Sequence, residues 1–367
     1  MNYNIIKNSR FLVVFLIPLF LGSLSIFSFQ PFNVTILNFI LIPCLFSLIV
    51  YVGKKSKNTY RNKPYLKNLF FLGYCFGIGF FLTGTYWISK SLTYDESLKN
   101  LVPFAIILIP LFLGLFFGLG TLIAGIFIKN NFLSILFFCS IISFIDFLRG
   151  KIFTGFPWNL WAYSWSWFPE ILQLINVVGL YAFNLFTLII FCLPLLLFFK
   201  RDKKNISILL LLLVIFFSNY IYGSLRINKE VDKYNSKTLS KSENINIKLV
   251  SPNFDLKYNI SKQDLENLIK KLIKFSEPKK NIKTIFVWPE GIFTGYNYND
   301  LLSYQNLFTE NFSKNHTLIF GVNTIDKNLN YFNSFIAVNN KFEVIYKYNK
   351  KKLVPFGEFL PFENFLQ

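Results

Sequence analysis

Residues 101–128 read LVPFAIILIPLFLGLFFGLGTLIAGIFI, an apolar run without a charged side chain. A helix needs about 20 mostly apolar residues to cross the hydrocarbon core of a bilayer, so this run is long enough to span one. Similar runs recur along the chain up to about residue 223, separated by short polar segments. They predict membrane-spanning helices at roughly 11–29, 35–53, 69–89, 101–128, 132–148, 176–199 and 206–223. We therefore expect an α-helical polytopic membrane bundle of about seven spans.

The composition of the chain is that of a membrane protein, with 53% hydrophobic and 16% charged residues. The net charge of +19 does not indicate nucleic-acid binding, because many basic residues lie in the short loops and no basic stripe contains interleaved aromatics. All four cysteines (Cys44, Cys75, Cys139 and Cys192) lie in apolar runs, and His316 is the sole histidine. These residues predict neither a disulfide framework nor a metal site, and we expect no cofactor.

The basic residues of the loops predict which way the bundle is inserted. If the N terminus is cytoplasmic, the cytoplasmic segments hold Lys7, Arg10, Lys54, Lys55, Lys57, Arg61, Lys63, Lys67, Lys129, Lys200, Arg201, Lys203 and Lys204. The outer segments then hold only Lys90, Lys99, Arg149 and Lys151. This is the bias of the positive-inside rule. With seven spans, the chain after residue 223 emerges on the outer face.

The C-terminal part of the chain changes to a water-soluble composition with alternating helix and strand patterns. We expect a transmembrane domain at 1–225, a polar linker at 226–244 and an α/β domain at 245–367. Strands are expected at 245–250, 284–288, 317–322, 332–338 and 342–348, and helices at 263–275 and 301–312. Asn339 and Asn340 predict a tight hairpin turn between the last two strands.

Two segments of the α/β domain hold candidates for chemistry. Glu290 lies in Val287-Trp-Pro-Glu-Gly291, where the end of a strand would hold a carboxylate rigidly enough for a general base. The simpler interpretation of Glu290 is a turn acid or a helix N-cap. Lysines 350–352 precede Leu-Val-Pro-Phe-Gly-Glu358, and a lysine run is usually a solvated surface. If a strand continues to Leu353, Lys350 and Lys352 share one face and Lys351 takes the other.

Several segments together are similar to bacterial apolipoprotein N-acyltransferases, which are membrane enzymes with a nitrilase-like domain of the carbon-nitrogen hydrolase superfamily. The similarity is carried by residues 27–33 (FSFQPFN), 148–158 (LRGKIFTGFPW) with 163–164 (YS), 252–253 (PN), 288–290 (WPE) and 350–358 (KKKLVPFGE). On composition alone the segment 148–167 is an interfacial aromatic belt. The ordered set covers nearly the whole chain and is more specific than any one of its segments.

The resemblance implies an αββα nitrilase-like domain on the periplasmic side of a bacterial inner membrane, in a monomer. It implies that Glu290 is the general base, that Lys350 stabilises the oxyanion and that Glu358 is a second glutamate of the site. It also implies substrate contacts by Trp158, Tyr163, Asn253, Tyr258 and Trp288. After Pro-Asn the family usually has a lysine followed by tryptophan, whereas here Lys257 is followed by Tyr258 at a shorter spacing, which puts the role of Tyr258 outside the family pattern.

The implied reaction transfers an acyl chain from a phospholipid to the N-terminal amine of an apolipoprotein's diacylglyceryl-cysteine, through a thioester on a cysteine. In the family that cysteine follows Glu358 by several tens of residues, whereas here no cysteine follows Cys192 and the sequence ends at Gln367. We therefore expect an incomplete α/β domain that lacks the nucleophile.

Three other functions stay open on the sequence alone. A membrane-tethered nitrilase-type amidase would not require the Gly155-Phe-Pro-Trp158 segment. A transporter or binding module would need ionisable residues within its spans, where Asp146 is the main example. A catalytically inactive, truncated relative of the enzyme would retain the motifs without forming a thioester.

Overall fold

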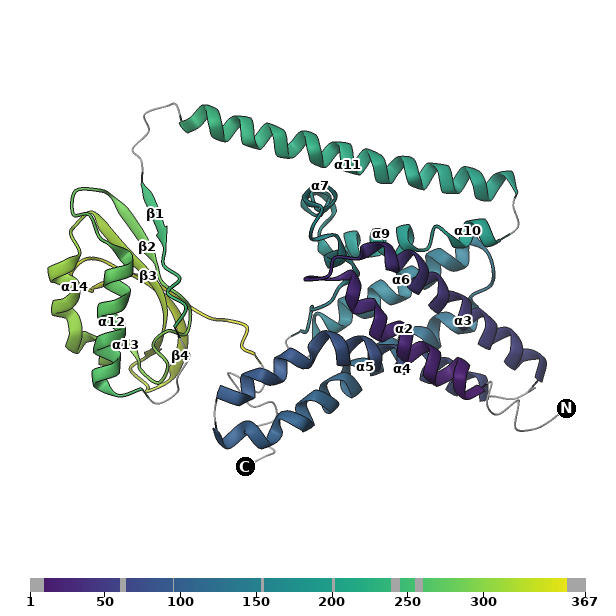
Figure 1. Ribbon diagram of the computed structural model, residues 1–367, viewed down its shortest axis with the longest axis horizontal. Coiled ribbons are helices and arrows are strands. Elements are labelled where there is room, and N and C mark those ends of the chain that lie inside the picture. Colours follow the sequence, from purple (N-terminus) through teal and green to yellow (C-terminus); the bar gives the residue numbers. More distant parts are fainter. Residues whose placement is uncertain are drawn as a thin grey trace. The chain divides into compact units, whose positions relative to one another are not determined.

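The computed structural model describes residues 10–59, 64–94, 96–152, 155–199, 202–238, 245–254 and 260–354. The chain forms two compact units. The first comprises Met1–Thr93 with Ser97–Ser236, and the second comprises Tyr94–Glu96 with Lys237–Gln367. The first unit is helical and the second contains a β-sheet with helices (Figure 1).

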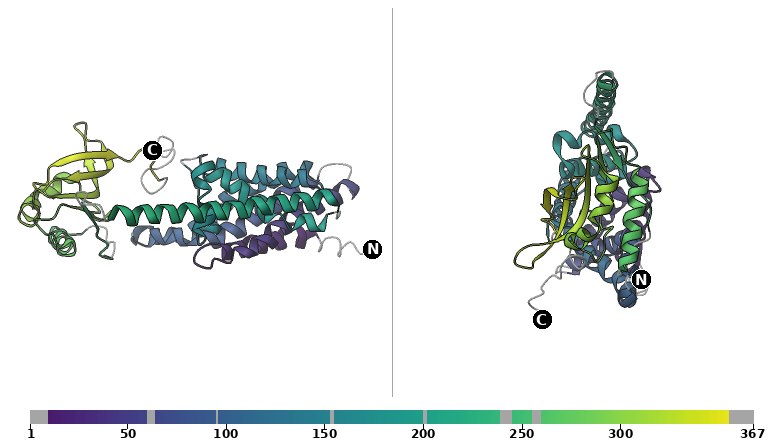
Figure 2. Two further views of the ribbon diagram at one scale, coloured as in Figure 1. Left: turned by 90° about the horizontal axis from the view of Figure 1, so that it is seen from above. Right: turned by 90° about the vertical axis from the view of Figure 1, so that its left-hand side faces the viewer.

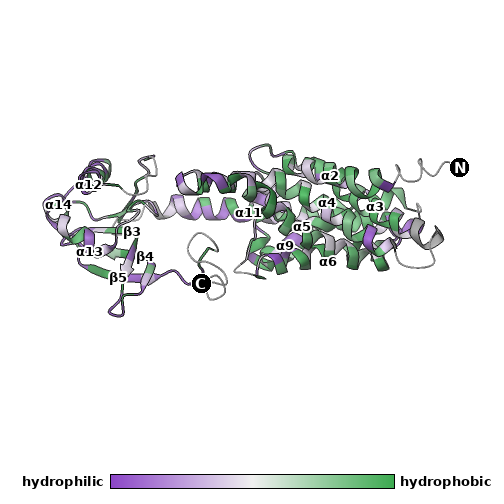
Figure 3. Cartoon of the chain, turned by 90° about the horizontal axis from the view of Figure 1, so that it is seen from below, coloured by the Kyte–Doolittle hydropathy of each residue, from purple (hydrophilic) through white to green (hydrophobic). Residues whose placement is uncertain are grey.

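Six helices among the described residues are long and apolar enough to cross a membrane. Five of them are formed mainly by α3 (Asn38–Thr59), α4 (Pro64–Thr85), α5 (Val102–Phe127), α6 (Phe132–Arg149) and α11 (Lys203–Thr238), and the sixth joins α9 (Leu180–Phe191) to α10 (Leu195–Phe198). Apolar residues dominate these helices except α11, which also has a long hydrophilic part (Figure 3). The expectation of a polytopic helical bundle is confirmed.

The first expected span, 11–29, forms a helix that is shorter than these six. It consists of a π-helical turn (Leu12–Leu16), α2 (Ile17–Ser25) and a 3₁₀ turn (Ile26–Ser28). Phe29 then leaves the helical conformation, and Pro31 follows without an amide hydrogen to continue a helical ladder. Of the seven expected spans, six thus correspond to the long helices and the first corresponds to a shorter apolar helix; a second shorter apolar helix, Pro169–Val178, precedes α9.

Glycines allow α4 to pack closely against its neighbours. A Cβ atom on Gly73 would overlap the Thr121 side chain and the Phe117 carbonyl of α5. Thr121 Oγ1 donates a hydrogen bond across this contact to the carbonyl of Leu69, at 2.8 Å. Small residues at helix contacts are typical of membrane bundles, because helix association in lipid depends on close van der Waals packing and on interhelical hydrogen bonds.

Helix α11 continues through the first part of the segment that the sequence assigns to a linker, 226–244. Residues 224–238 contain neither glycine nor proline, and Lys233 lies 3.7 Å from Glu230 on the same helix. Within the first unit, Asn219 Nδ2 donates to the carbonyl of Ile171, at 3.1 Å. This contact ties α11 to the connection between α6 and α9.

The second unit contains a five-stranded sheet in the order β1-β2-β3-β4-β5. The strands are β1 (Asn246–Leu249), β2 (Thr284–Val287), β3 (His316–Ile325), β4 (Tyr331–Val338) and β5 (Val344–Asn349). β1, β2 and β3 are parallel, and β4 pairs antiparallel with both β3 and β5. All five expected strands are present, with small differences at their ends.

Helices cover one face of this sheet, as Figures 1 and 2 show. They are α12 (Lys262–Ser276), α13 (Tyr298–Leu301) and α14 (Gln305–Asn311). The core beneath them includes Phe286, Leu318 and Phe320, which are at most 1% exposed. The expected helix at 301–312 is interrupted by a 3₁₀ turn, Leu302–Tyr304, before α14 begins.

The opposite face of the sheet is apolar and uncovered among the described residues. Ile247, Leu249, Phe335, Tyr346 and Tyr348 are 66%, 75%, 46%, 61% and 46% exposed, and the strand register places them on this face. An αββα sandwich would cover such a face with a second sheet. The described residues form one helix layer and one sheet, which is a partial α/β domain.

The connection between β4 and β5 is longer than the tight Asn339-Asn340 turn that the sequence predicts. It is closed by a hydrogen bond from the amide of Asn339 to the carbonyl of Glu343, at 3.1 Å. Phe342 has a φ of +61° and is 1% exposed, with its ring centroid 4.0 Å from that of Phe308. Burial of this aromatic ring outweighs the local preference for a short turn.

We predict that Gly73→Ala lowers the free energy of unfolding of the helical unit by about 1–3 kcal/mol, because the added methyl group overpacks the contact with α5. Gly53→Ala is the control, since a Cβ there would lie 3.4 Å from the Gly125 carbonyl, close to ordinary contact distance. Reversible unfolding in detergent micelles measures both variants. Equal stability of the two variants would show that the Gly73 contact is not tight.

Candidate active site

Glu290 lies just beyond the end of β2, over the uncovered face of the sheet. The amide of Trp288 still pairs with the carbonyl of Ile319, at 2.9 Å, and the chain then turns through Pro289 and Glu290. A Cβ atom on Gly321 of β3 would lie 3.4 Å from Glu290 Cγ. The glycine thus leaves room for the glutamate stem on this face. The Glu290 side chain is 76% exposed, so its carboxylate lies in solvent and not among apolar side chains.

Lys350 follows β5 directly, because the strand ends at Asn349 and does not continue to Leu353. Its amide donates to the carbonyl of Asn333, at 2.8 Å, which extends the pairing with β4 by one residue. Tyr348 lies opposite Phe335 on the uncovered face, and Asn349 lies opposite Ser334 on the other face. Alternation along the strand then turns Lys350 toward the face where Glu290 lies.

The structure brings Glu290 and Lys350 together. Lys350 Nζ lies 4.0 Å from Glu290 Oε1, and the lysine side chain is 34% exposed. β2 and β5 point in the same direction, because two antiparallel pairings separate β5 from β3 and β2 is parallel to β3. Residues that follow these two strands therefore lie at the same end of the sheet, where both strands have their carboxyl ends. At this separation the two groups form an ion pair without a direct hydrogen bond.

A set of polar side chains that the sequence does not single out together supports the end of β5. Ser334 Oγ is 2.6 Å from Thr324 Oγ1, and it donates to Asn349 Oδ1, at 2.9 Å. Ser334 is 2% exposed and Thr324 is 6% exposed. These bonds fix Asn349 and so the start of the lysine segment. In the sequence, this set is indicated only by the presence of polar residues at Thr324, Ser334 and Asn349 within the strands.

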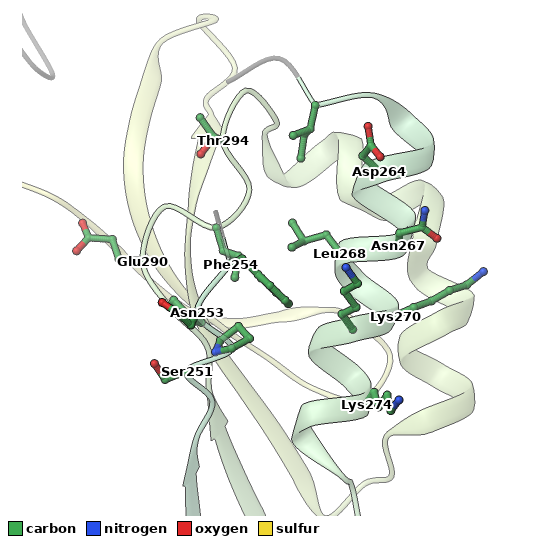
Figure 4. Close-up of a pocket in the computed structure, with 15 residues that line it drawn as sticks. Ser251, Asn253, Phe254, Asp264, Asn267, Leu268, Lys270, Lys274, Glu290 and Thr294 are labelled. Atoms are coloured by element: carbon green, nitrogen blue, oxygen red, sulfur yellow. The ribbon is translucent and has the colours of Figure 1, made fainter. Parts of the chain in front are cut away.

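A groove of about 760 Å³ lies beside Glu290 in the α/β unit. Its walls come from the residues after β1, from α12 and from the turn after β2 (Figure 4). Asn253, with a φ of +50°, lines it together with Phe254. Lys270, Lys271 and Lys274 of α12 bring positive charge to the groove, although Lys270 also contacts Glu266, at 2.6 Å.

The other expected site residues are not all in this groove. Trp288 is 3% exposed, and its Nε1 donates to Ser276 Oγ, at 2.9 Å, so its ring belongs to the core. Its ring centroid lies 5.7 Å from that of Phe320. Tyr258 and Glu358 lie outside the described residues. Asn253 is thus the one expected substrate contact that the structure places beside Glu290 within the described part of the α/β unit.

Trp158 and Tyr163 lie in the helical unit, on the connection between α6 and α9. Trp158 is 51% exposed, and its ring centroid lies 5.5 Å from that of Trp87, in an edge-to-face arrangement. Tyr163 is half-buried, and burial raises the pKa of its hydroxyl, with a further increase from Tyr181 and a smaller opposing effect from Arg149. No sequence motif marks Trp87, which lies beside Trp158 only in the folded chain.

Thiol and metal chemistry have no candidate groups in the described part of the α/β unit. No group of three or more His, Cys, Asp or Glu side chains that could hold a metal occurs among the described residues. All four cysteines lie in the helical unit, where the Sγ atoms of Cys139 and Cys192 are 3.8 Å apart.

These features define a polytopic membrane protein that carries a partial α/β domain with a Glu–Lys pair at one end of the sheet. The family model for the N-terminal domain of apolipoprotein N-acyltransferases matches residues 21–193. Beyond this range, the chain is similar to apolipoprotein N-acyltransferases over nearly its whole length.

Three relatives named apolipoprotein N-acyltransferase illustrate the extent of this similarity. The proteins of Rhodopseudomonas palustris and Rickettsia prowazekii are each 26% identical over 96% of this chain, and they are covered to 66% and 67% of their own length. The Bradyrhizobium diazoefficiens protein is 27% identical, with 96% of this chain and 66% of the relative aligned. The chain thus spans about two thirds of the length of the relatives that it matches.

We predict that Trp288→Ala destabilises the α/β unit by about 3–5 kcal/mol, because it empties a core position and leaves Ser276 without its indole partner. Tyr331→Ala is the control in the same unit, since Tyr331 is 72% exposed. Hydrogen exchange at the amides of β2 and β3 measures the loss. Unchanged protection in Trp288→Ala would contradict the structural role of this side chain.

Proposed function

We propose that this chain supplies Glu290 and Lys350 to an N-acyltransferase reaction. An acyl chain passes from a phospholipid to the α-amine of the diacylglyceryl-cysteine at the N terminus of an apolipoprotein. The proposal is carried by the 4.0 Å Glu290–Lys350 pair at an exposed end of the sheet beside a groove. Similarity to apolipoprotein N-acyltransferases over 96% of the chain supports the substrate classes.

The two groups have complementary roles in this reaction. The Glu290 carboxylate accepts the proton of a thiol, and the thiolate attacks the ester carbonyl of the phospholipid. The Lys350 ammonium stabilises the oxyanion of the tetrahedral intermediate, an effect of about 3–4 kcal/mol for one well-placed donor. The carbon–oxygen bond breaks, the lysophospholipid oxygen takes the proton, and a thioester remains.

The second half-reaction uses the same pair. The amine of the lipoprotein attacks the thioester carbonyl, the carbon–nitrogen bond forms, and the carbon–sulfur bond breaks. Glu290 receives the proton of the amine and returns it to the departing sulfur. The thiol is regenerated, and no oxidant or metal is required for the balance of the reaction.

The thiol itself lies outside the α/β residues of this sequence. No cysteine occurs between residues 245 and 367. The four cysteines of the chain lie in the helical unit, inside apolar helices or at their ends. The proposed reaction therefore uses a cysteine that is not among these 367 residues.

The membrane helices serve the same reaction by confinement. Both substrates carry acyl chains, so a catalytic domain attached to the bilayer meets them at a raised effective concentration. We place the α/β unit on the periplasmic side of a bacterial inner membrane, in a monomer. The positive-inside bias of the loops supports this side if the shorter helix Leu12–Ser28 also crosses, because 17 residues rise about 25 Å, close to the thickness of the hydrocarbon core.

We predict that Glu290→Gln and Lys350→Met each lower N-acylation by roughly 10²–10⁴-fold, because they remove the general base and the oxyanion cation. The assay uses the gene product in membranes, including any residues that the reading frame adds after Gln367. Mass spectrometry of a diacylglyceryl-cysteine peptide detects the product. Lys351→Met is the matched control, because it removes the same charge from the exposed neighbouring residue.

Different results would contradict different parts of this proposal. Full activity of Glu290→Gln or Lys350→Met would remove that residue from the mechanism. Release of free fatty acid or ammonia without an N-acylated peptide would identify a membrane-tethered amidase or esterase. Equal loss of activity in Lys351→Met would mean that general positive charge matters and not the position of Lys350.

A further inference from the structure

A buried charged network lies at the end of α6, far from the Glu–Lys pair in sequence. Asp146 and Arg149 are each 1% exposed, and Asn184 is fully buried. Arg149 Nη2 donates to Asp146 Oδ1, at 2.9 Å, and Asn184 Nδ2 donates to Asp146 Oδ2, at 3.1 Å. Ionisable residues within membrane helices are costly, so such a pair usually has a function beyond packing.

The network holds the loop that follows α6 at several points. Arg149 Nη1 donates to the carbonyls of Phe156, at 2.6 Å, and Trp158, at 2.8 Å. The carbonyl of Arg149 accepts from the amide of Phe156, at 2.8 Å. Asn184 Oδ1 accepts from the amide of Ala162, at 3.0 Å. The backbone of residues 156–162 is thus bound near its start, at Trp158 and at its end.

The same loop presents Trp158 beside Trp87, at the end of α4. The indole Nε1 of Trp87 donates to the carbonyl of Gly84, at 2.9 Å, which fixes this ring. Asn159, with a φ of +56°, packs on Gly84, where an added Cβ would overlap the Asn159 amide group. Both rings are about half exposed, although hydrogen bonds hold the Trp87 ring and the Trp158 backbone. Exposed tryptophans near a helix end settle at the headgroup level of a bilayer.

We propose that Arg149 is a positioning residue that sets the backbone of the loop 156–162 and thereby holds Trp158 beside Trp87 as a contact for phospholipid. Asp146 compensates the buried charge of the guanidinium, while the Arg149 bonds to the Phe156 and Trp158 carbonyls set the loop. The role of this lipid as an acyl donor rests on the proposed function. The lipid contact itself does not, because it can be measured without catalysis.

The test measures quenching of tryptophan fluorescence by phosphatidylethanolamine with brominated acyl chains, in vesicles that contain the full chain. The Trp158 contribution is the difference in quenching between each protein and the same protein with Trp158→Phe added. Arg149→Lys keeps a cation beside Asp146, but one ammonium cannot replace the guanidinium bonds to two carbonyls and a carboxylate together. We expect the Trp158 contribution to be lost in Arg149→Lys and reduced in Trp87→Phe.

Asp146→Asn is the matched control for a merely structural role. It removes the ion pair but leaves the Arg149 bonds to the Phe156 and Trp158 carbonyls in place. We expect Asp146→Asn to lower thermal stability at least as much as Arg149→Lys does. We also expect it to keep the Trp158 contribution. The proposal would be overturned if Asp146→Asn lost the Trp158 contribution as Arg149→Lys does, with the loss in each variant in proportion to its loss of stability.

A further variant covers the case in which Arg149→Lys does not fold. Asp146→Asn combined with Arg149→Gln contains no unpaired buried charge, so it avoids the main cost of breaking the pair. We expect this neutral variant to insert and to lose the Trp158 contribution. An unchanged Trp158 contribution in either Arg149 variant would show that Arg149 does not set the loop. Loss of N-acylation with normal lipid contact would concern the proposed function alone.

Discussion

The antiparallel register of β4 against β5 is the constraint on which the candidate site depends. With Ser334 opposite Asn349, the next residue, Lys350, turns to the face of the sheet where Glu290 lies. A slip of one residue would turn Lys350 toward the helix-covered face, because side chains alternate along a strand. The buried hydrogen bonds of Ser334 to Asn349 and Thr324 oppose such a slip. The Glu–Lys pair is therefore a consequence of sheet pairing and not of flexible side chains alone.

Each unit contains groups in surroundings that are unfavourable for them: buried polar groups in the helical unit and an exposed apolar face in the α/β unit. In the helical unit, Asp146, Arg149 and Asn184 satisfy one another and the adjoining loop within an apolar bundle. In the α/β unit, helices bury one face of the sheet, and the described residues leave the other face apolar and open. An exposed apolar face of this kind is unfavourable in water. The candidate residues lie at the edge of that open face, so whatever covers it would also border the Glu–Lys pair.

Much of this architecture follows from local sequence patterns. Apolar runs indicate the membrane helices, and alternating patterns locate all five strands, because both signals depend on residues close together in the chain. Strand parity also places Lys350 on the correct face. Tertiary packing decides the remaining features. Phe342 adopts a left-handed conformation to reach the core, and Trp288 turns inward to Ser276. Trp87 becomes notable only because the loop after α6 brings Trp158 beside it.

The central claim is that the Glu290–Lys350 pair serves acyl transfer through a thioester. The most direct measurement incubates the membrane-bound gene product with phospholipid that carries a labelled acyl chain, in the absence of lipoprotein. The account predicts a label bound covalently to the protein, released by hydroxylamine and transferred to an added diacylglyceryl-cysteine peptide. Label that appears only as free fatty acid, or a protein adduct that resists hydroxylamine, would contradict it.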